Sequence, residues 1–539
     1  MNNFHTLFFK FLKKRQFYTW AGLIGIIFLY ATLLLKDLGT LPGMFFDEAN
    51  YASEVQSFAT FGTDIHGLNN PVYLTSVWGQ GQSILYMWLS YPIVKIFGFS
   101  IFNFRLSMVL TGLSLLSVIT IVTRIISKNT LLTYTVSIFL VTSPWLFMSF
   151  RWVLDANIAP IILTLGVWIL IYAFQKNIDS KLGKYFSYLG VFFIAISTYG
   201  YIAFWMYLPI FLLVLGIYSI KNNIASKKNA LTYAFFIVLL VFPLIIFAVK
   251  VNVSHSNSVG RFLFFDIPNL PAGRSSSLVD FTQGNPAKIV FKNFLTGIKM
   301  YLSGNDSLPW NIVPGYGVVH PTLLIFSLFG LMVPSQQFNN FKHAVSITKL
   351  QFLSFFPLMF IVTPNFNHWN ALNIPLVLLG SFGLYYLLYK IKNFHIKLTL
   401  LAIPVVLFIF FMQVYISPTS FSSSSLVNYK TVQKLNEKVR GHKLYIPSLN
   451  WNFAYFKLVK NVSPTYYKKY QDHLNADGLA PKYSFSNLRD ISQIDKHIDK
   501  SDFILISPNE TNVYDHKFKI KFMKNINFSN NYLILYQIK

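Results

Sequence analysis

The stretch Phe45-Phe46-Asp47-Glu48-Ala49-Asn50-Tyr51 follows the first long apolar run of the chain, residues 17–35, after a short Pro-Gly turn. Two adjacent carboxylates are costly to keep so close to a low-dielectric boundary. A carboxylate held beside apolar surface has a raised pKa and can serve as a general base. The same pair could equally be a solvated loop start or a helix N-terminus, where the macrodipole favours negative charge. The rest of the chain decides between these readings.

The composition is that of a membrane protein. Of 539 residues, 54% are hydrophobic and 12% are charged, and the mean hydropathy is +0.47. A soluble domain carries about 25% charged residues, and here the apolar residues cluster in runs long enough to span a bilayer. The net charge of +26 does not indicate nucleic-acid binding, because Lys and Arg lie mostly in short loops between apolar runs. The absence of Cys excludes disulfides and thiolate metal sites.

The apolar stretch 84–98 decides the topology. It has 15 residues, including Pro92 and Lys95, which is short for a span and suits a helix lying on the outer surface. If it crossed the membrane, the later lysine-rich loops would all lie outside, against the positive-inside rule. The basic residues of segment 1–16 place the N-terminus in the cytoplasm. Asp47 and Asp155 are then expected on the same, outer face.

We therefore expect an all-α polytopic protein with about eleven transmembrane helices in residues 1–416, the C-terminus outside, and outer loops at 36–103 and 250–319. The expected spans are 17–35, 104–124, 131–148, 157–174, 185–200, 202–220, 231–249, 320–334, 350–364, 372–390 and 398–416. Residues 417–425 read as a linker. Residues 426–539 are more polar and contain short β-type runs at Lys443–Ile446, Phe503–Ile506 and Tyr532–Gln537, which predict a small extracytoplasmic α/β domain.

A second acidic position follows Ser143-Pro144-Trp145 at the outer end of a span. Arg151 and Asp155 are four residues apart, so on a helix they would share a face and could pair. They are either an ion pair that caps the next span, or functional groups. In the second case Arg151 meets an anion and Asp155 orients a sugar, a base or a cation.

A third cluster, residues 363–375, places amides and His368 in an outer loop between two spans. His368 is either part of a hydrogen-bonded helix cap or a contact for phosphate or sugar. His320 has the same alternatives. A divalent metal is conceivable, but no ligand spacing demands one. Aromatic residues at another outer edge form either an interfacial belt or a stacking surface for a sugar or prenyl chain; they are Tyr199, Tyr201, Trp205 and Tyr207.

Together these motifs resemble the membrane glycosyltransferases of family 39, which are related to protein O-mannosyltransferases and lipid A aminoarabinose transferases. The resemblance covers roughly residues 17–390, and residues 417–539 resemble nothing in that family. The motifs that carry it are Phe46-Asp47-Glu48-Ala49 with Tyr51, Gly62-Thr63-Asp64, Phe104-Arg105-Leu106-Ser107, Ser143-Pro144-Trp145 with Arg151 and Asp155, and Asn367-His368-Trp369-Asn370 with Ile374-Pro375.

The resemblance implies the GT-C fold and a polyprenyl-phosphate sugar donor used on the outer face of the membrane. Asp47 matches the family's catalytic acid, Glu48 its neighbour, and Asp155 the second-loop acidic residue, where many bacterial relatives have Glu. Positions that could contact substrate are Tyr51, Arg105, Arg151, Arg261 and His368. Arg105, at the start of a span, is either an interfacial anchor or a partner for phosphate.

The sequence thus predicts an integral plasma-membrane glycosyltransferase that acts on a hydroxyl acceptor of the cell envelope, a glycolipid or a protein. A carboxylate base would drive a single inverting displacement. The alternative is a transporter or flippase of lipid-linked sugars, and a structural membrane component is a third possibility. A transporter should carry polar groups near the bilayer midplane, whereas the polar residues here collect at the outer edge, which favours an enzyme.

Overall fold

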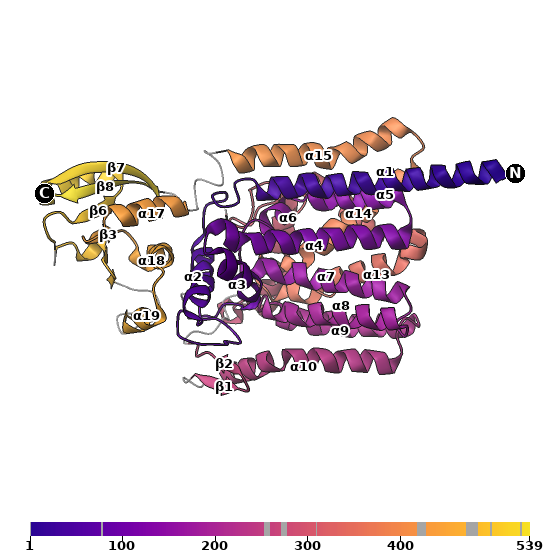
Figure 1. Ribbon diagram of the computed structural model, residues 1–539, viewed down its shortest axis with the longest axis horizontal. Helices are drawn as coiled ribbons and strands as arrows, with labels where there is room; N and C mark the ends of the chain where they lie inside the picture. The colour runs from indigo at the N-terminus through magenta and orange to yellow at the C-terminus, as the bar shows by residue number, and fades with distance from the viewer. Residues whose placement is uncertain are drawn as a thin grey trace.

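The computed structural model describes residues 2–76, 79–252, 259–270, 278–308, 310–417, 427–470, 483–495, 498–528 and 531–539. Long helices lie side by side in one bundle, and a β-sheet with short helices lies beyond one end of it (Figure 1). We call this the sheet end of the bundle. The N-terminus of α1 (Asn2–Leu35) projects from the opposite end (Figure 1).

The other helices of the bundle are α4 (Ile101–Ser127), α5 (Thr130–Val141), α6 (Pro144–Ser149), α7 (Asp155–Gln175), α8 (Lys181–Ile196), α9 (Phe204–Lys221), α10 (Lys227–Asn252), α12 (Leu324–Met332), α13 (Lys342–Leu353), α14 (Asn373–Lys390) and α15 (Phe394–Ile416). Within the described ranges, seven helices are long and apolar enough to cross a membrane, namely α1, α4, α7, α9, α10, α14 and α15. The chain is a multi-pass membrane protein.

Seven such helices are fewer than the eleven spans expected, and the reasons are local. The run 131–148 is divided because Pro144 opens the separate helix α6. The run 350–364 is not one helix, since α13 ends at Leu353 and a 3-10 turn with Pro357 follows. In addition, α8 has 16 residues and α12 has 9, so each is short for a span.

Helices α7 and α14 form the centre of the bundle, because 89% of the most apolar window of each is buried; the value is 17% for α10 and 22% for α15. Helix α8 packs closely on α7 where Gly166 and Gly190 face each other. A Cβ on Gly166 would lie only 2.6 Å from the Gly190 carbonyl oxygen, so the two backbones could not approach with any larger residue there.

Two short helices, α2 (Phe46–Phe61) and α3 (Leu85–Phe97), lie at the sheet end, and α2 runs across the direction of the spans (Figure 1). With 13 residues, α3 is too short to cross a bilayer. The long segment 250–319, expected as a loop, contains the hairpin β1 (Gly260–Phe262) and β2 (Phe265–Ile267) and an amphipathic helix, α11 (Pro286–Ser303). The hairpin is bonded to residues 70–72 through the backbone of Asp266.

The C-terminal region contains a mixed six-stranded sheet, as expected of an α/β region. The strand order is β4 (Ser484–Phe485), β5 (Leu488–Asp490), β3 (Leu444–Ile446), β6 (Phe503–Ile506), β8 (Asn531–Ile538) and β7 (Ile520–Phe528). Strand β3 is parallel to β5 and β6, and β8 is antiparallel to β6 and β7. The three β-type runs of the sequence coincide with β3, β6 and β8, whereas β4, β5 and β7 were not expected.

Among the described residues of this region, the α-helices that accompany the sheet are α17 (Tyr429–Lys438), α18 (Leu449–Val459), α19 (Pro464–Tyr470) and α20 (Thr511–Phe518). The expected linker 417–425 lies almost wholly outside the described residues. Immediately after it, Val427 pairs with Met44 by two backbone hydrogen bonds of 2.7 and 3.0 Å. The C-terminal region is therefore joined to the chain two residues before α2 begins.

Candidate active site

Asp47 lies in the first turn of α2, half-buried, where the helix dipole favours a negative charge. Tyr455 of α18 lies nearby. Burial raises the pKa of the Tyr455 phenol, and the negative charges of Asp47 and Glu48 raise it further. Asp47 is thus placed where the bundle and the C-terminal region meet, close enough to the buried Tyr455 phenol for its charge to act on it.

Glu48 points away from solvent and pairs with Arg105 of α4. The guanidinium donates to both carboxylate oxygens, at 2.8 and 2.6 Å, and also to backbone carbonyls of the turn before α2 at 2.8–3.3 Å. The Val153 amide donates to Glu48 Oε1 at 3.2 Å. Both side chains are fully buried. These contacts give Glu48 and Arg105 a framework role in this structure, although Arg105 was one of the positions considered for a substrate contact.

Arg151 is also committed to the framework. Its two terminal nitrogens donate to the carbonyls of Leu33, Leu34, Lys36 and Leu41 at 2.7–2.9 Å. The guanidinium lies over the Phe147 and Tyr415 rings at 5.3 and 5.8 Å. Because Arg151 occupies the turn before α7, it does not share a helix face with Asp155. Arg151 instead holds the end of α1 in place.

Asp155 opens α7 and is 6% exposed. Its Oδ1 accepts a hydrogen bond from the Ala156 amide at 2.8 Å, and its Oδ2 lies 3.3 Å from Ser83 Oγ and 3.5 Å from the Ser83 amide. The hydroxyl of Tyr51 donates to the Ser83 carbonyl. Tyr51 is fully buried, and burial together with the charge of Asp155 raises its pKa. Tyr51 therefore supports the loop that holds Asp155, although it was expected to contact substrate.

Three rings cluster at Phe45, two residues before Asp47 in the chain. Phe45 stacks on Trp310 with ring centroids 4.7 Å apart and planes 16° from parallel, and it meets Trp152 edge-on at 6.1 Å. Phe45 and Trp310 are partly exposed, as a sugar-stacking surface requires. Among the described residues, the buried indole N–H of Trp152 has no hydrogen-bond partner. Trp152 and Trp310 were not expected at the site, because each is one aromatic residue among many in this sequence.

The motif at residues 363–375 contacts the motif that ends at Asp155. The side-chain amide of Asn370 donates to the Ala156 carbonyl, next to Asp155. His368 belongs to a hydrogen-bonded cap in this structure. Its Nδ1 lies 3.0 Å from Thr363 Oγ1 and 2.9 Å from the Thr363 carbonyl, and its backbone amide donates to Asn365 Oδ1. His320 likewise caps a turn through Thr322. The three motifs that lie far apart in the sequence thus meet at the sheet end of the bundle.

Arg261 has no contact with Asp47 or Asp155 among those described; it is exposed on strand β1, opposite Asp266. The Asp266 carboxylate accepts hydrogen bonds from the amides of Asn69 and Asn70 at 2.9 and 3.2 Å. A Cβ on Gly260, the residue before Arg261, would meet the Lys250 ammonium at 2.5 Å. Two cations, Lys250 and Arg261, therefore gather at the end of α10.

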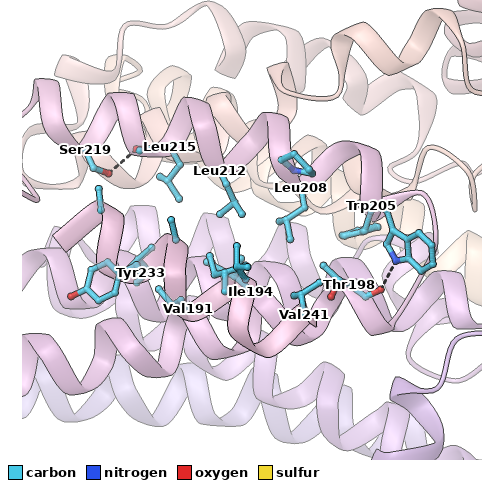
Figure 2. Close-up of a pocket in the computed structure, with 18 of the residues that line it drawn as sticks. Val191, Ile194, Thr198, Trp205, Leu208, Leu212, Leu215, Ser219, Tyr233 and Val241 are labelled. Carbon is cyan, nitrogen blue, oxygen red and sulfur yellow. Dashed lines mark hydrogen bonds between the residues drawn. The ribbon is translucent and has the colours of Figure 1, made fainter. Parts of the chain in front are cut away.

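An apolar groove of about 610 Å³ runs between α8, α9 and α10. Figure 2 shows Trp205 and Thr198 at one end and Ser219 and Tyr233 at the other. The lining from Trp205 to Ser219 follows α9 for roughly 21 Å, at about 1.5 Å per residue. Trp205 and Phe247 both contact the Tyr73 ring, at 5.9 and 4.8 Å, so this end of the groove meets the loop that precedes α3.

The loop that precedes α3 connects this end of the groove with Asp155. Leu74, next to Tyr73, exchanges two backbone hydrogen bonds with Gln82, at 2.8 and 2.7 Å. The residue after Gln82 is Ser83, which binds Asp155. Of the aromatic residues considered as a belt or a stacking surface, Trp205 lines the groove, whereas the Tyr207 hydroxyl is bonded to the Gln351 carbonyl. No group of three or more His, Cys, Asp or Glu side chains able to hold a metal ion occurs in the described part of the chain.

No family model matches this sequence, and no curated protein matches it. Solved structures do match. ArnT from Cupriavidus metallidurans in the apo state aligns over 96% of this chain and 98% of its own, with a TM-score of 0.55 and 9% sequence identity. The structure of the same protein bound to undecaprenyl phosphate aligns over 96% and 97%, with a TM-score of 0.56 and 10% identity. Across almost its whole length the chain has the ArnT fold, the GT-C membrane glycosyltransferase fold that the sequence motifs indicated.

Proposed function

We propose that this protein transfers a sugar from a polyprenyl-phosphate donor to a hydroxyl acceptor at the sheet end of the bundle. One observation carries the proposal: an apolar groove leads to a loop that binds an acidic residue, Asp155, at the surface where a second acid, Asp47, begins α2. A fold shared with a protein bound to undecaprenyl phosphate supports the lipid-phosphate part of it.

In this proposal the prenyl chain lies in the groove. The lining is almost entirely apolar, and the groove opens between helices α9 and α10, whose spans are 33% and 17% buried and so face lipid for much of their surface. The donor phosphate then lies at the groove end marked by Trp205. Arg261 and Lys250 are the cations proposed to meet it, since Arg105 and Arg151 are buried and bonded to protein groups.

The chemistry follows from the two carboxylates. An acceptor hydroxyl is a poor nucleophile at neutral pH, so Asp47 takes its proton as the oxygen attacks the sugar C1. The bond from C1 to the phosphate oxygen breaks on the opposite side, and polyprenyl phosphate leaves, with its charge stabilised by nearby cations. This single displacement inverts the anomeric centre. Asp155 orients donor sugar or acceptor through a geometry fixed by Ser83.

The proposed orientation places the sheet end outside the cell. The N-terminus of α1, with its basic residues, lies at the opposite end of the bundle (Figure 1). The acceptor is then a component of the cell envelope, a glycolipid or a protein, reached from outside the membrane.

The test uses purified protein in detergent with a panel of polyprenyl-phosphate sugars and candidate acceptors. Release of polyprenyl phosphate is followed for the wild type, Asp47→Asn and Asp155→Asn. Asp37→Asn is the matched control, because Asp37 is an exposed acid of the preceding loop. We expect release with one sugar, reduced on the order of 100-fold or more by Asp47→Asn and unchanged by Asp37→Asn.

Equal release by the wild type and Asp47→Asn would remove Asp47 as the base. The competing class, a transporter of lipid-linked sugars, predicts a different result. A transporter in proteoliposomes would move a labelled donor across the bilayer without releasing polyprenyl phosphate, whatever acceptor is supplied.

A further inference from the structure

The C-terminal region packs on the bundle through α18, which runs alongside α2. The Phe453 and Phe46 rings lie 6.4 Å apart, and Asn461 Nδ2 lies 3.5 Å from Thr60 Oγ1. Asn461 lies two residues beyond the end of α18, and the contacts occur in the same order along the two chain segments, so α18 and the residues that follow it run in the same general direction as α2. Between them, Lys457 of α18 reaches the middle of α2, the helix whose first turn carries Asp47.

Lys457 is 2% exposed. Its ammonium donates to Asn50 Oδ1 at 2.6 Å and lies over the Tyr467 and Phe453 rings at 5.4 and 5.9 Å. Burial lowers the Lys457 pKa to about 8, while the negative charge of Glu54, one turn beyond Asn50, acts to raise it. An apolar side chain would fill this space without the desolvation cost of a charge. A buried ammonium at Lys457 is explained if its hydrogen bond to Asn50 Oδ1 is needed to fix the orientation of the Asn50 side chain.

The Asn50 side chain passes this contact onward. Its Nδ2 donates to Gln82 Oε1 at 3.1 Å. Gln82 is held by its backbone pair with Leu74, and the next residue, Ser83, binds the Asp155 carboxylate. A continuous series of contacts therefore connects Lys457 in the C-terminal region with Asp155 at the start of α7.

We propose that Lys457 is a positioning residue of the active site: by fixing Asn50, it holds the loop of Gln82 and Ser83 in the register that orients Asp155. The C-terminal region is then a part of the catalytic framework and not only a surface for acceptors. This inference rests on the proposed function for its activity measurement.

The test compares Lys457→Met, Asn50→Leu and the double variant with the wild type. Lys517→Met is the matched control, because Lys517 is an exposed lysine of the same region, paired with Asp495. Three quantities are measured: release of polyprenyl phosphate, hydrogen exchange of the backbone amides of Leu74, Gln82 and Ser83, and disulfide formation in a Thr60→Cys/Asn461→Cys background. The chain has no native Cys, so only the introduced pair can form a disulfide.

We expect each single variant to lower turnover on the order of 100-fold and to speed exchange of the three amides. The double variant should lose no more than either single variant, because both interrupt one series of contacts. Disulfide formation should remain as in the wild type, and Lys517→Met should change nothing.

The inference would be overturned if the fold-losses of turnover in the two single variants multiplied in the double variant, or if the exchange of the three amides stayed as in the wild type. Loss of the disulfide in Lys457→Met would also overturn it, because the lysine would then only dock the two parts of the chain. If the wild type releases no polyprenyl phosphate with any donor, the proposed function fails instead, and the amide exchange still tests the connection from Lys457 to Gln82.

Discussion

The Arg105 guanidinium and the Glu48 carboxylate meet through two parallel hydrogen bonds, with neither side chain exposed to solvent. This pair ties α2 to α4 directly beside Asp47. The neighbouring acids Asp47 and Glu48 thus differ in environment. Asp47 lies half-buried at the start of the helix, whereas Glu48 forms a buried ion pair with Arg105. Adjacent residues at the start of a helix point in different directions, so one can face a site while the other faces its support.

Removing one partner of this pair should destabilise the protein strongly. We expect Glu48→Leu or Arg105→Met to lower the free energy of unfolding by about 3–5 kcal/mol, because the remaining group is left buried without its counter-charge. The loss should appear as a lower melting temperature in detergent. The double variant Glu48→Leu/Arg105→Met should be closer to wild type than either single change, and equal melting temperatures throughout would contradict a framework role.

The apolar groove offers a test of the donor's lipid chain. Gly216 lies in the groove with open space where its Cβ would be, so Gly216→Phe should fill the groove without distorting α9. We expect the KM for a long polyprenyl donor to rise at least about tenfold, which corresponds to about 1.4 kcal/mol of lost binding, and a short-chain donor to be affected much less.

Gly25→Phe is the control for that change. Gly25 on α1 also has nothing near its Cβ position, but it lies away from the groove. The groove assignment fails if both variants keep the wild-type KM for the long donor, or if both raise it equally.

Arg261→Gln should weaken donor binding more than turnover. An exposed arginine that meets a phosphate contributes mainly through charge, so the KM for the donor should rise several-fold and the wild-type KM should also rise with salt. Arg440→Gln, at another exposed arginine, should leave the KM unchanged. A drop in kcat at constant KM would instead assign Arg261 to the chemical step.

Glu54 predicts a pH dependence of stability. Burial raises its pKa from 4.5 to about 7, with Lys457 acting in the opposite direction. The folded protein therefore holds a proton on Glu54 that the unfolded chain has lost between about pH 4.5 and 7, and this contribution to stability declines as the pH rises through that window. Glu54→Gln should accordingly gain melting temperature relative to wild type between pH 5 and 7.5. A constant difference across that range would show that Glu54 is ionised throughout.

His66 is influenced by the charge of the same lysine, Lys457, and its contribution to stability changes with pH in the opposite direction to that of Glu54. Burial and the charge of Lys457 lower its pKa from 6.5 to about 3, so its contribution to stability grows as the pH rises from about 3 to 6.5. Comparing Glu54→Gln with His66→Phe separates the two, because the difference from wild type should change with pH in opposite directions.

Apolar runs and acidic motifs gave most of the architecture in advance. Long apolar segments such as α4 and α15 were predicted closely, since membrane spans need little beyond length and hydropathy. The convergence of residues around 47, 155 and 370 also follows from the motifs once the stretch 84–98 lies on the surface. Where spans are short or interrupted by proline, as at α5 and α6, hydropathy alone joined separate helices into one.

The roles of individual charged residues could not be predicted. Arg151 and Asp155 have helical spacing, but the helix starts only at Asp155, so spacing alone suggested a pair that the structure does not form. Lys457 was missed because its partner Asn50 is 407 residues away, and nothing local distinguishes it from other lysines. Trp152 and Trp310 share this difficulty, because their significance lies in the third residue, Phe45, that brings them together.

The backbone pair between Met44 and Val427 has a consequence for how the protein is made. The start of α2 is completed by residues that the ribosome adds only after the last spanning helix, α15, has been synthesised. A nascent chain can insert its helices one after another while Asp47 still lacks the neighbours supplied by α18. Under the function proposed above, the site of such a protein is complete only when its final segment has been made, so an incomplete copy left in the membrane would not transfer sugar.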